Sequence, residues 1–323
     1  MAAPGPLEAR VLFARAGGPD PERAWLEASA ESRTRAARAA AALARLGTRA
    51  LLTSDPDYPP GLRDLPDPPR VLFVRGALPE CRRTVAIVGS RAASPYGTAC
   101  ARRVARDLGT LGYCVVSGLA RGIDAAAHHG ALEAGGSSVA VLPGGLDAVA
   151  PRHHRALAEM LCERGGLASE CPAGPPPARG VFVRRNRLIA ALAAVTVVVE
   201  AAERSGALST AAAARRLGRP LLAVPGDIDR PTSRGVHALI RSGARLCEGA
   251  GDVVAAIPRA RPGGVETAEM KLLAALDADA CGAEALAAAA GLGLDETLST
   301  LLRLEWAGAV TVRPGQRWAR VRS

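Results

Sequence analysis

One short stretch limits what this chain can fold into more than any other. Residues 115–124 read Val-Val-Ser-Gly-Leu-Ala-Arg-Gly-Ile-Asp, an apolar run that stops at a glycine-rich turn, and residues 125–134 follow as a helix-forming segment. A buried strand, a turn of small residues and a helix form the repeating unit of a parallel α/β sheet. Such a turn places backbone N–H groups and a helix N-terminus at the carboxyl end of the strand, where phosphates and other anions bind. The stretch therefore predicts both a fold class and a place for an anion.

The same unit recurs from residue 84 to residue 257. Apolar strands are expected at residues 85–88, 114–117, 138–142, 167–169, 195–199, 221–224 and 244–247. Helix-forming segments lie between them. This alternation predicts an α/β fold with an extended, Rossmann-like, doubly wound and mostly parallel sheet, whose crossovers are right-handed.

The flanking sequence predicts two smaller parts. Residues 1–60 are expected to form a short helical N-terminal module, with Asp20 as the N-cap of one of its helices. The Rossmann-like domain then spans residues 61–257. Residues 258–265 form a linker, and residues 266–323 contain three helices followed by a hairpin, which is the plan of a winged helix.

The helix expected at residues 295–306 is the one that would enter a DNA groove in a winged helix. Its only basic side chain is Arg303, whereas reading bases normally takes Arg, Lys, Asn or Gln. We therefore expect this part to be a protein-contact or auxiliary element. A winged-helix transcription factor, which would bind duplex DNA with sequence preference, is the less favoured alternative.

The balance of charge favours a polyanionic partner. The chain has 41 Lys and Arg against 31 Asp and Glu, a formal net charge of +10, and such an excess attracts nucleic acids. The seven cysteines are odd in number and scattered, which favours free thiols in a reducing compartment. No stretch approaches the ~20 apolar residues of a membrane span, and the N-terminus does not match a signal peptide. We therefore expect a cytoplasmic protein.

Arginines recur in the turns that follow the expected strands. Arg91, Arg121 and Arg204 each follow a strand, and residues 184–187 read Arg-Arg-Asn-Arg at the start of a helix. Because the carboxyl ends of parallel strands share one edge of a sheet, these side chains are expected to line one basic groove. Glycine amides of the same turns are expected beside them, at Gly89, Gly118, Gly122 and Gly206.

Five further positions have narrower roles. The Ser205 hydroxyl is expected to bind phosphate, and Asp124 is expected to cap its helix. Of His128 and His129, one is expected to face the sheet and the other the solvent. Phe182 either packs in the core or, at the mouth of the groove, stacks on a base.

The turns do not match a dinucleotide site. They contain no G-x-G-x-x-G, and the second strand ends in Ser117 rather than in the acid that would hold a ribose. No residues have the spacing of a metal site or of a Ser-His-Asp relay. We therefore expect no cofactor, no metal ion and no catalytic residue.

Five blocks of the sequence resemble the DNA-processing protein A family, also called DprA or Smf. They are residues 85–91, 117–124 with 127–128, 182–189, 199–201 with 205–206, and 218–220 with 224–226. The resemblance implies a non-catalytic protein that binds single-stranded DNA in the basic pocket of an extended Rossmann fold. It also implies a role in natural transformation and recombination, in which such proteins protect incoming DNA, help to displace single-strand-binding protein and load the RecA recombinase. A homodimer formed through the Rossmann domain is implied as well.

The resemblance assigns specific positions to the pocket. They are Ser90, Arg91, Ser117, Gly118, Arg121, Phe182, Arg184, Arg185, Asn186 and Arg187. The predicted site combines them with the remaining groove positions, Gly89, Gly122, Arg204, Ser205 and Gly206.

An enzyme is the main alternative. Nucleotide phosphoribohydrolases of the lysine-decarboxylase-like family share this type of sheet and carry a P-G-G-x-G-T-x-x-E block. Residues 143–148 here read Pro-Gly-Gly-Leu-Asp-Ala, so the Gly-Thr pair and the catalytic glutamate are missing. The sequence therefore favours a binding protein over a hydrolase.

Overall fold

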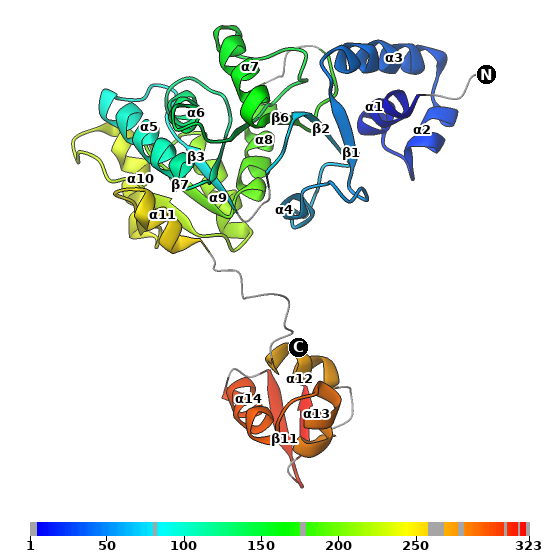
Figure 1. Ribbon diagram of the computed structural model, residues 1–323, viewed down its shortest axis with the longest axis vertical. Helices are drawn as coiled ribbons and strands as arrows, with labels where there is room; N and C mark the ends of the chain where they lie inside the picture. Colours follow the sequence, from blue (N-terminus) through cyan, green and yellow to red (C-terminus); the bar gives the residue numbers. More distant parts are fainter. Residues whose placement is uncertain are drawn as a thin grey trace. The chain divides into compact units, whose positions relative to one another are not determined.

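The chain folds into two compact units, Met1–Pro258 and Arg259–Ser323 (Figure 1). A computed structural model describes residues 5–79, 83–174, 179–257, 268–276, 281–306, 309–315 and 317–320. The predicted linker at residues 258–265 lies outside these described residues.

A nine-stranded sheet forms the centre of the first unit. Its strands are β1 (Arg49–Leu52), β2 (Val71–Gly76), β3 (Thr84–Val88), β4 (Cys114–Ser117), β5 (Ser138–Val141), β6 (Gly166–Ser169), β7 (Val195–Val198), β8 (Leu221–Ala223) and β9 (Arg245–Leu246). Their order is β1-β2-β6-β5-β4-β3-β7-β8-β9. The pairs β1·β2 and β2·β6 are antiparallel, and the others are parallel.

This strand order confirms the predicted doubly wound, mostly parallel sheet. The chain winds outward from β3 to β6 and then returns to the other side of β3 as β7. The order therefore reverses between β3 and β7, and ligands of open α/β sheets bind in the crevice at such a switch point, outside the carboxyl ends of the strands.

Helices cover both faces of the sheet, because alternate side chains of each strand point to opposite faces. In β3, Ala86 and Val88 pack in one core cluster, while Val85 and Ile87 pack in another. The first face carries α4 (Pro60–Arg63), α8 (Arg179–Leu192), α9 (Ala207–Arg216) and α10 (Arg234–Arg241). The second face carries α5 (Pro95–Thr110), α6 (Ile123–Glu133), α7 (Arg155–Arg164) and α11 (Ala250–Ala256).

The N-terminal helices are α1 (Pro6–Ala16), α2 (Pro21–Glu27) and α3 (Ala30–Arg45). Asp20 caps α2 as predicted, since its carboxylate accepts a 2.9 Å hydrogen bond from the Arg23 N–H. The three helices share a core cluster with β2, β5 and α7. The predicted boundary at residue 60 therefore does not separate two units, and β1, which the sequence analysis missed, already belongs to the large sheet.

The second unit confirms the predicted winged helix. It contains α12 (Ala268–Ala275), α13 (Ala283–Ala290), α14 (Leu294–Trp306), β10 (Cys281–Gly282), β11 (Val310–Arg313) and β12 (Arg317–Arg320). Its small sheet has the order β10-β12-β11, and its core includes Leu272, Leu301 and Trp318.

The described helices offer little length for a membrane span. No single described helix is long and apolar enough to cross a membrane. Only α13 and residues 294–305 taken together reach that length and apolar character, and this pair of helices is bent by 107°.

Candidate functional site

A cavity of about 550 Å³ opens at the switch point between β3 and β7. Three stretches contribute most of its lining: the turn after β3, the first half of α8 and the turn before α9. Eight predicted site residues line it: Gly89, Ser90, Arg91, Phe182, Arg185, Asn186, Ser205 and Gly206. The structure thus brings together residues from three separate parts of the sequence.

The mouth of the cavity combines a cation with an aromatic ring. Arg91 is exposed, and its guanidinium carbon lies 4.8 Å from the centroid of the Phe182 ring. Arg121 and Arg204 are also exposed. Arg121 directly follows the lining residue Ala120, and Arg204 directly precedes the lining residue Ser205.

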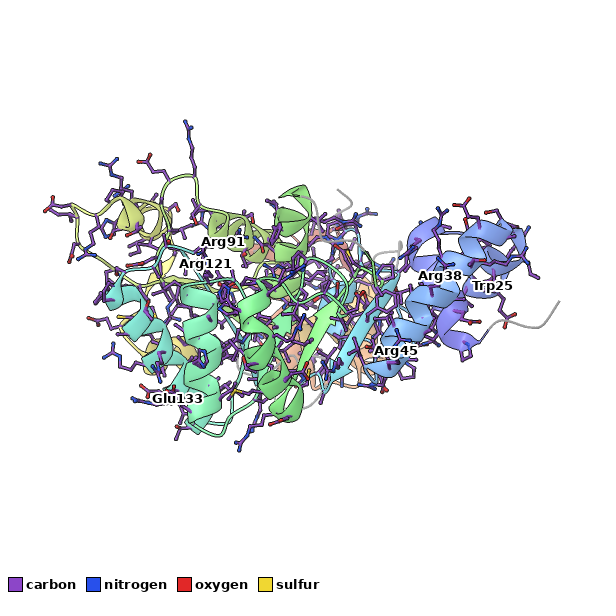
Figure 2. All side chains as sticks on the ribbon, turned by 90° about the horizontal axis from the view of Figure 1, so that it is seen from above. Trp25, Arg38, Arg45, Arg91, Arg121 and Glu133 are labelled. Atoms are coloured by element: carbon purple, nitrogen blue, oxygen red, sulfur yellow. The ribbon has the colours of Figure 1, made fainter. Side chains whose placement is uncertain are left out.

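These three arginines are without carboxylate partners among the described residues. Figure 2 shows Arg91 and Arg121 over the α/β part of the first unit, away from Arg38 and Arg45 of α3. The three guanidinium groups are therefore available to an external anion, and we refer to Arg91, Arg121 and Arg204 as the rim arginines.

The floor of the cavity holds a cation of a different kind. Arg185 is only 3% exposed. Its Nη1 donates to the Gly118 carbonyl at 2.8 Å and to the Val141 carbonyl. Gly118 leaves room for this guanidinium, because a Cβ there would collide with it. Arg185 therefore ties α8 to the ends of β4 and β5.

Asp124 is the charge partner of Arg185. Burial raises the pKa of the Asp124 carboxyl, and the Arg185 guanidinium opposes that rise. Burial also lowers the pKa of Arg185 to about 10, which still leaves it protonated at neutral pH. The Coulombic attraction between the two groups partly offsets the cost of burying them.

The predicted cap role of Asp124 is wrong. The N-cap of α6 is Gly122, and Asp124 lies in the first turn, where its Oδ2 accepts the Ala120 N–H at 3.3 Å. Gly122 has a φ of +78°, and a Cβ there would collide with the Ser90 carbonyl. The Ile123 N–H donates to that carbonyl at 3.2 Å. Glycine at 122 thus serves to join the turns after β3 and β4.

Three predicted residues lie elsewhere. The Ser117 hydroxyl is buried and donates to the Ile87 carbonyl at 2.6 Å. The Arg187 side chain, 12% exposed, pairs with Glu170 at 2.6 Å and with Asp67 at 3.3 Å. Arg184 lines a second cavity instead. These side chains do not line the first cavity, because partners inside the protein engage them or because they face another way.

Asn186 and Ser209 connect α8 with α9. The Asn186 amide donates to the Gly206 carbonyl at 3.1 Å and to Ser209 Oγ at 2.8 Å. Ser205 Oγ accepts the Ala207 N–H at 3.3 Å. The two Asn186 bonds hold α8 against the start of α9, and residues of both line the cavity.

The sequence analysis missed one supporting residue, Glu200. It is 4% exposed, and its carboxylate accepts hydrogen bonds from the Ser94 N–H at 2.9 Å and from the Ser94 hydroxyl. Ser94 in turn caps α5 by accepting the Gly97 N–H at 3.0 Å. The sequence held one signal for this role, because Glu200 is an acidic residue at the end of an apolar strand.

The prediction that one of the two histidines of α6 faces the sheet and the other the solvent is confirmed. His128 is fully buried and His129 is exposed. Ser138 Oγ donates to the Val115 carbonyl at 2.7 Å, so it accepts from the Nδ1–H of His128 at 2.7 Å. Burial lowers the pKa of His128 to about 3, and the imidazole is therefore neutral at pH 7.

Comparisons with known proteins place the chain in a family. A family model described as DNA recombination-mediator protein A matches residues 49–258, and one described as DprA winged helix domain matches residues 257–316. Protein Smf of Escherichia coli is 40% identical over 275 residues, which are 80% of this chain and 74% of that protein.

Two solved structures share the fold. The X-ray structure of DNA processing protein A from Streptococcus pneumoniae matches with a TM-score of 0.64 at 34% identity, over 75% of this chain and 84% of its own. That of Helicobacter pylori, described for its unique single-stranded DNA binding mode, matches with a TM-score of 0.57 at 28% identity, over 64% of this chain and 94% of its own. This chain belongs to the DNA recombination-mediator protein A family, whose members are also named DprA and Smf.

Proposed function

We propose that this protein binds single-stranded DNA across the first cavity and acts as a recombination mediator rather than as an enzyme. The observation that carries the proposal is the stack of Arg91 on Phe182 at the mouth of the cavity, with no carboxylate of the described residues on the guanidinium. A free guanidinium binds phosphate, and an aromatic face stacks on an unpaired base. The single-stranded DNA binding of the H. pylori relative supports the same reading.

The distribution of charge supports a site in the first unit. Residues 259–323 contain eight Arg or Lys and eight Asp or Glu, so their formal charges cancel. The excess of +10 therefore lies in residues 1–258. Phosphate binding depends on such an excess, and the first unit is where the strand would bind.

Within the site, the rim and the floor have separate tasks. The rim arginines bind phosphates of the strand, Phe182 stacks on a base, and the cavity receives an unpaired nucleotide. The Arg185–Asp124 pair holds the walls of the cavity in place and makes no phosphate contact. Because the contacts at the first cavity are to phosphates and ring faces, this cavity has little sequence preference.

The wider role follows from the family. We propose that a homodimer formed through the first unit protects incoming DNA in natural transformation, helps to displace single-strand-binding protein and loads the RecA recombinase. The winged helix then contributes protein contacts, consistent with an α14 that has one basic residue, Arg303, and exposed leucines at 294, 298 and 302.

Two acids near the first cavity, Glu200 and Asp124, are already engaged within the protein, which disfavours the phosphoribohydrolase alternative. The Glu200 carboxylate is occupied by Ser94, and Asp124 is buried beside Arg185. We therefore favour a binding protein that releases no base from nucleoside monophosphates.

The test is a titration with matched single- and double-stranded oligonucleotides at two salt concentrations. Single strands should bind more tightly, with an affinity that falls with salt by about 0.7 log units per phosphate contacted. Arg91→Ala should weaken binding alike for all sequences, and Arg38→Ala, a change in an exposed arginine on α3, is the control. Equal binding of the parent and of Arg91→Ala would contradict the proposal.

A further inference from the structure

A second cavity, of about 370 Å³, lies at the same edge of the large sheet as the first. Its polar lining comes from Asp67, Arg70, Glu170 and Arg184. Glu170 directly follows β6, and Arg70 directly precedes β2. Because β2 runs antiparallel to β6, the start of β2 meets the carboxyl end of β6. The second cavity therefore opens at the edge that carries the rim arginines.

One buried oxygen of this cavity has no hydrogen bond within the described residues. Glu170 has a side chain that is 8% exposed, and its Oε1 accepts no hydrogen bond from the described residues. Arg184 Nε, on a side chain that is 66% exposed, forms an ion pair with that oxygen at 3.4 Å. Behind it, Arg187 pairs through Nη2 with Glu170 Oε2 at 2.6 Å and through Nε with Asp67 at 3.3 Å, and its Nη1 has no hydrogen bond within the described part of the chain. Buried polar groups in native proteins are normally satisfied, so Glu170 Oε1 is set to accept an N–H from outside.

The charge of this cluster suits a ligand that also carries an anion. Arg70, Arg184 and Arg187 supply three positive charges, against the two carboxylates of Asp67 and Glu170. One positive charge remains, and Arg70 and Arg184 are the cations that line the cavity. A group with both a phosphate and an N–H donor fits this set, and a nucleotide has both.

Helix α8 lies between the two cavities. Phe182 and Val183 line the first cavity, and the next residue, Arg184, lines the second. The bonds from Arg185 to the Gly118 and Val141 carbonyls hold this turn over the ends of β4 and β5, which separate β3 from β6. Three strand spacings span that separation, about 14 Å, or about four nucleotides at the 3.4 Å rise of a stacked strand.

We propose that the DNA strand bound in the first cavity continues over the N-terminal turn of α8 into the second cavity. There Arg70 and Arg184 bind a phosphate, and Glu170 Oε1 accepts an N–H from a base. Glutamate accepts well from the exocyclic amino group of cytosine, whereas thymine presents a carbonyl oxygen at that position. The second cavity therefore favours cytosine over thymine. This inference rests on the proposed function of the first cavity.

The experiment measures the affinity of the full chain for oligo(dC) and oligo(dT) in a length series of about 4 to 16 nucleotides. The parent should show a gain in affinity once the strand is long enough to reach both cavities, and this gain should be larger for oligo(dC). Arg184→Ala should remove about fivefold of affinity for long strands, the weight of one partly exposed ion contact, and leave short strands unaffected. Glu170→Gln should abolish the preference for cytosine.

Controls separate this inference from the function on which it rests. Arg91→Ala should lower the affinity for short and long strands alike. If it has no effect on affinity, the first cavity itself is wrongly assigned. If Arg91→Ala weakens binding while Arg184→Ala keeps the parent's length dependence, the second cavity is overturned alone. The second cavity is also overturned if Arg184→Ala lowers the affinity for strands of all lengths equally. Glu170→Gln removes a partner of Arg187 and can affect folding, so the comparison of oligo(dC) with oligo(dT) on the parent decides the base preference independently.

Discussion

Arginines at one edge of this sheet fall into two groups, and their difference explains the site. Arg91, Arg121 and Arg204 are exposed and have no carboxylate partner among the described residues. Arg185, which is buried, and Arg187, whose side chain is 12% exposed, come from the same short stretch of α8 and are engaged by carbonyls or carboxylates of the protein itself.

A guanidinium serves an external ligand only where the protein supplies no internal partner. The first group is therefore assigned to binding and the second to architecture, although the sequence presents the same residue in similar turns.

The largest effect is expected from Arg185→Ala. It removes the cation that opposes the burial-raised pKa of the Asp124 carboxyl, together with the bonds to the Gly118 and Val141 carbonyls. Losing one partner of a buried pair costs about 3–5 kcal/mol of the free energy of unfolding, measurable by urea denaturation. Adding Asp124→Asn should recover part of that loss. If Arg185→Ala kept the parent's stability but lost affinity for DNA, Arg185 would belong to the binding group.

The next effect concerns His128, which packs in the same buried region. The pKa of its imidazole is about 3 in the folded chain, against an ordinary value of 6.5. Between these values the unfolded state binds more protons, so stability falls as the pH drops below 6.5. The contribution is about 2 kcal/mol between pH 6.5 and pH 5.

His128→Gln should remove this part of the acid sensitivity in unfolding experiments at the two pH values. His129→Gln, on the exposed neighbour, should change the pH dependence less. Equal acid sensitivity of the parent and of His128→Gln would show that the imidazole is protonated in the folded chain.

A smaller effect, on affinity alone, is expected from Phe182→Leu. The substitution keeps an apolar side chain but removes the ring on which Arg91 and, in our proposal, a base are stacked. Stacking of one base contributes about 1–3 kcal/mol, so affinity for single strands should fall roughly tenfold or more while the melting temperature stays close to the parent's. A large drop in melting temperature with unchanged affinity would make Phe182 a core residue.

The sequence predicts the positions of the turns well because their signals are local. Each apolar run that stops at small residues is a strand end, as the match of residues 114–117 with β4 shows. Whether an arginine in such a turn is free depends on contacts that are distant in the sequence. Arg185 meets carbonyls 44 and 67 residues away, and Arg187 meets Asp67.

Two of the differences between the sequence-based expectation and the structure have the same cause. The strand β1 is short and antiparallel, and it exists because β2 offers a partner. Asp124 is a residue type that often caps helices. The turn after β3, however, contacts the start of α6 through the Ser90 carbonyl, and Gly122 is the N-cap. Tertiary packing therefore determines both the strand β1 and the N-cap of α6, and no local sequence pattern predicts either of them.

The most direct test of the division is the salt dependence of single-strand binding by a triple variant, Arg91→Ala with Arg121→Ala and Arg204→Ala. If each rim arginine contacts one phosphate, the slope of log affinity against log salt should become shallower by about 2. The thermal stability should remain that of the parent, since none of the three side chains has an internal carboxylate partner among the described residues. An unchanged slope would contradict the account, because the phosphates would then be bound elsewhere.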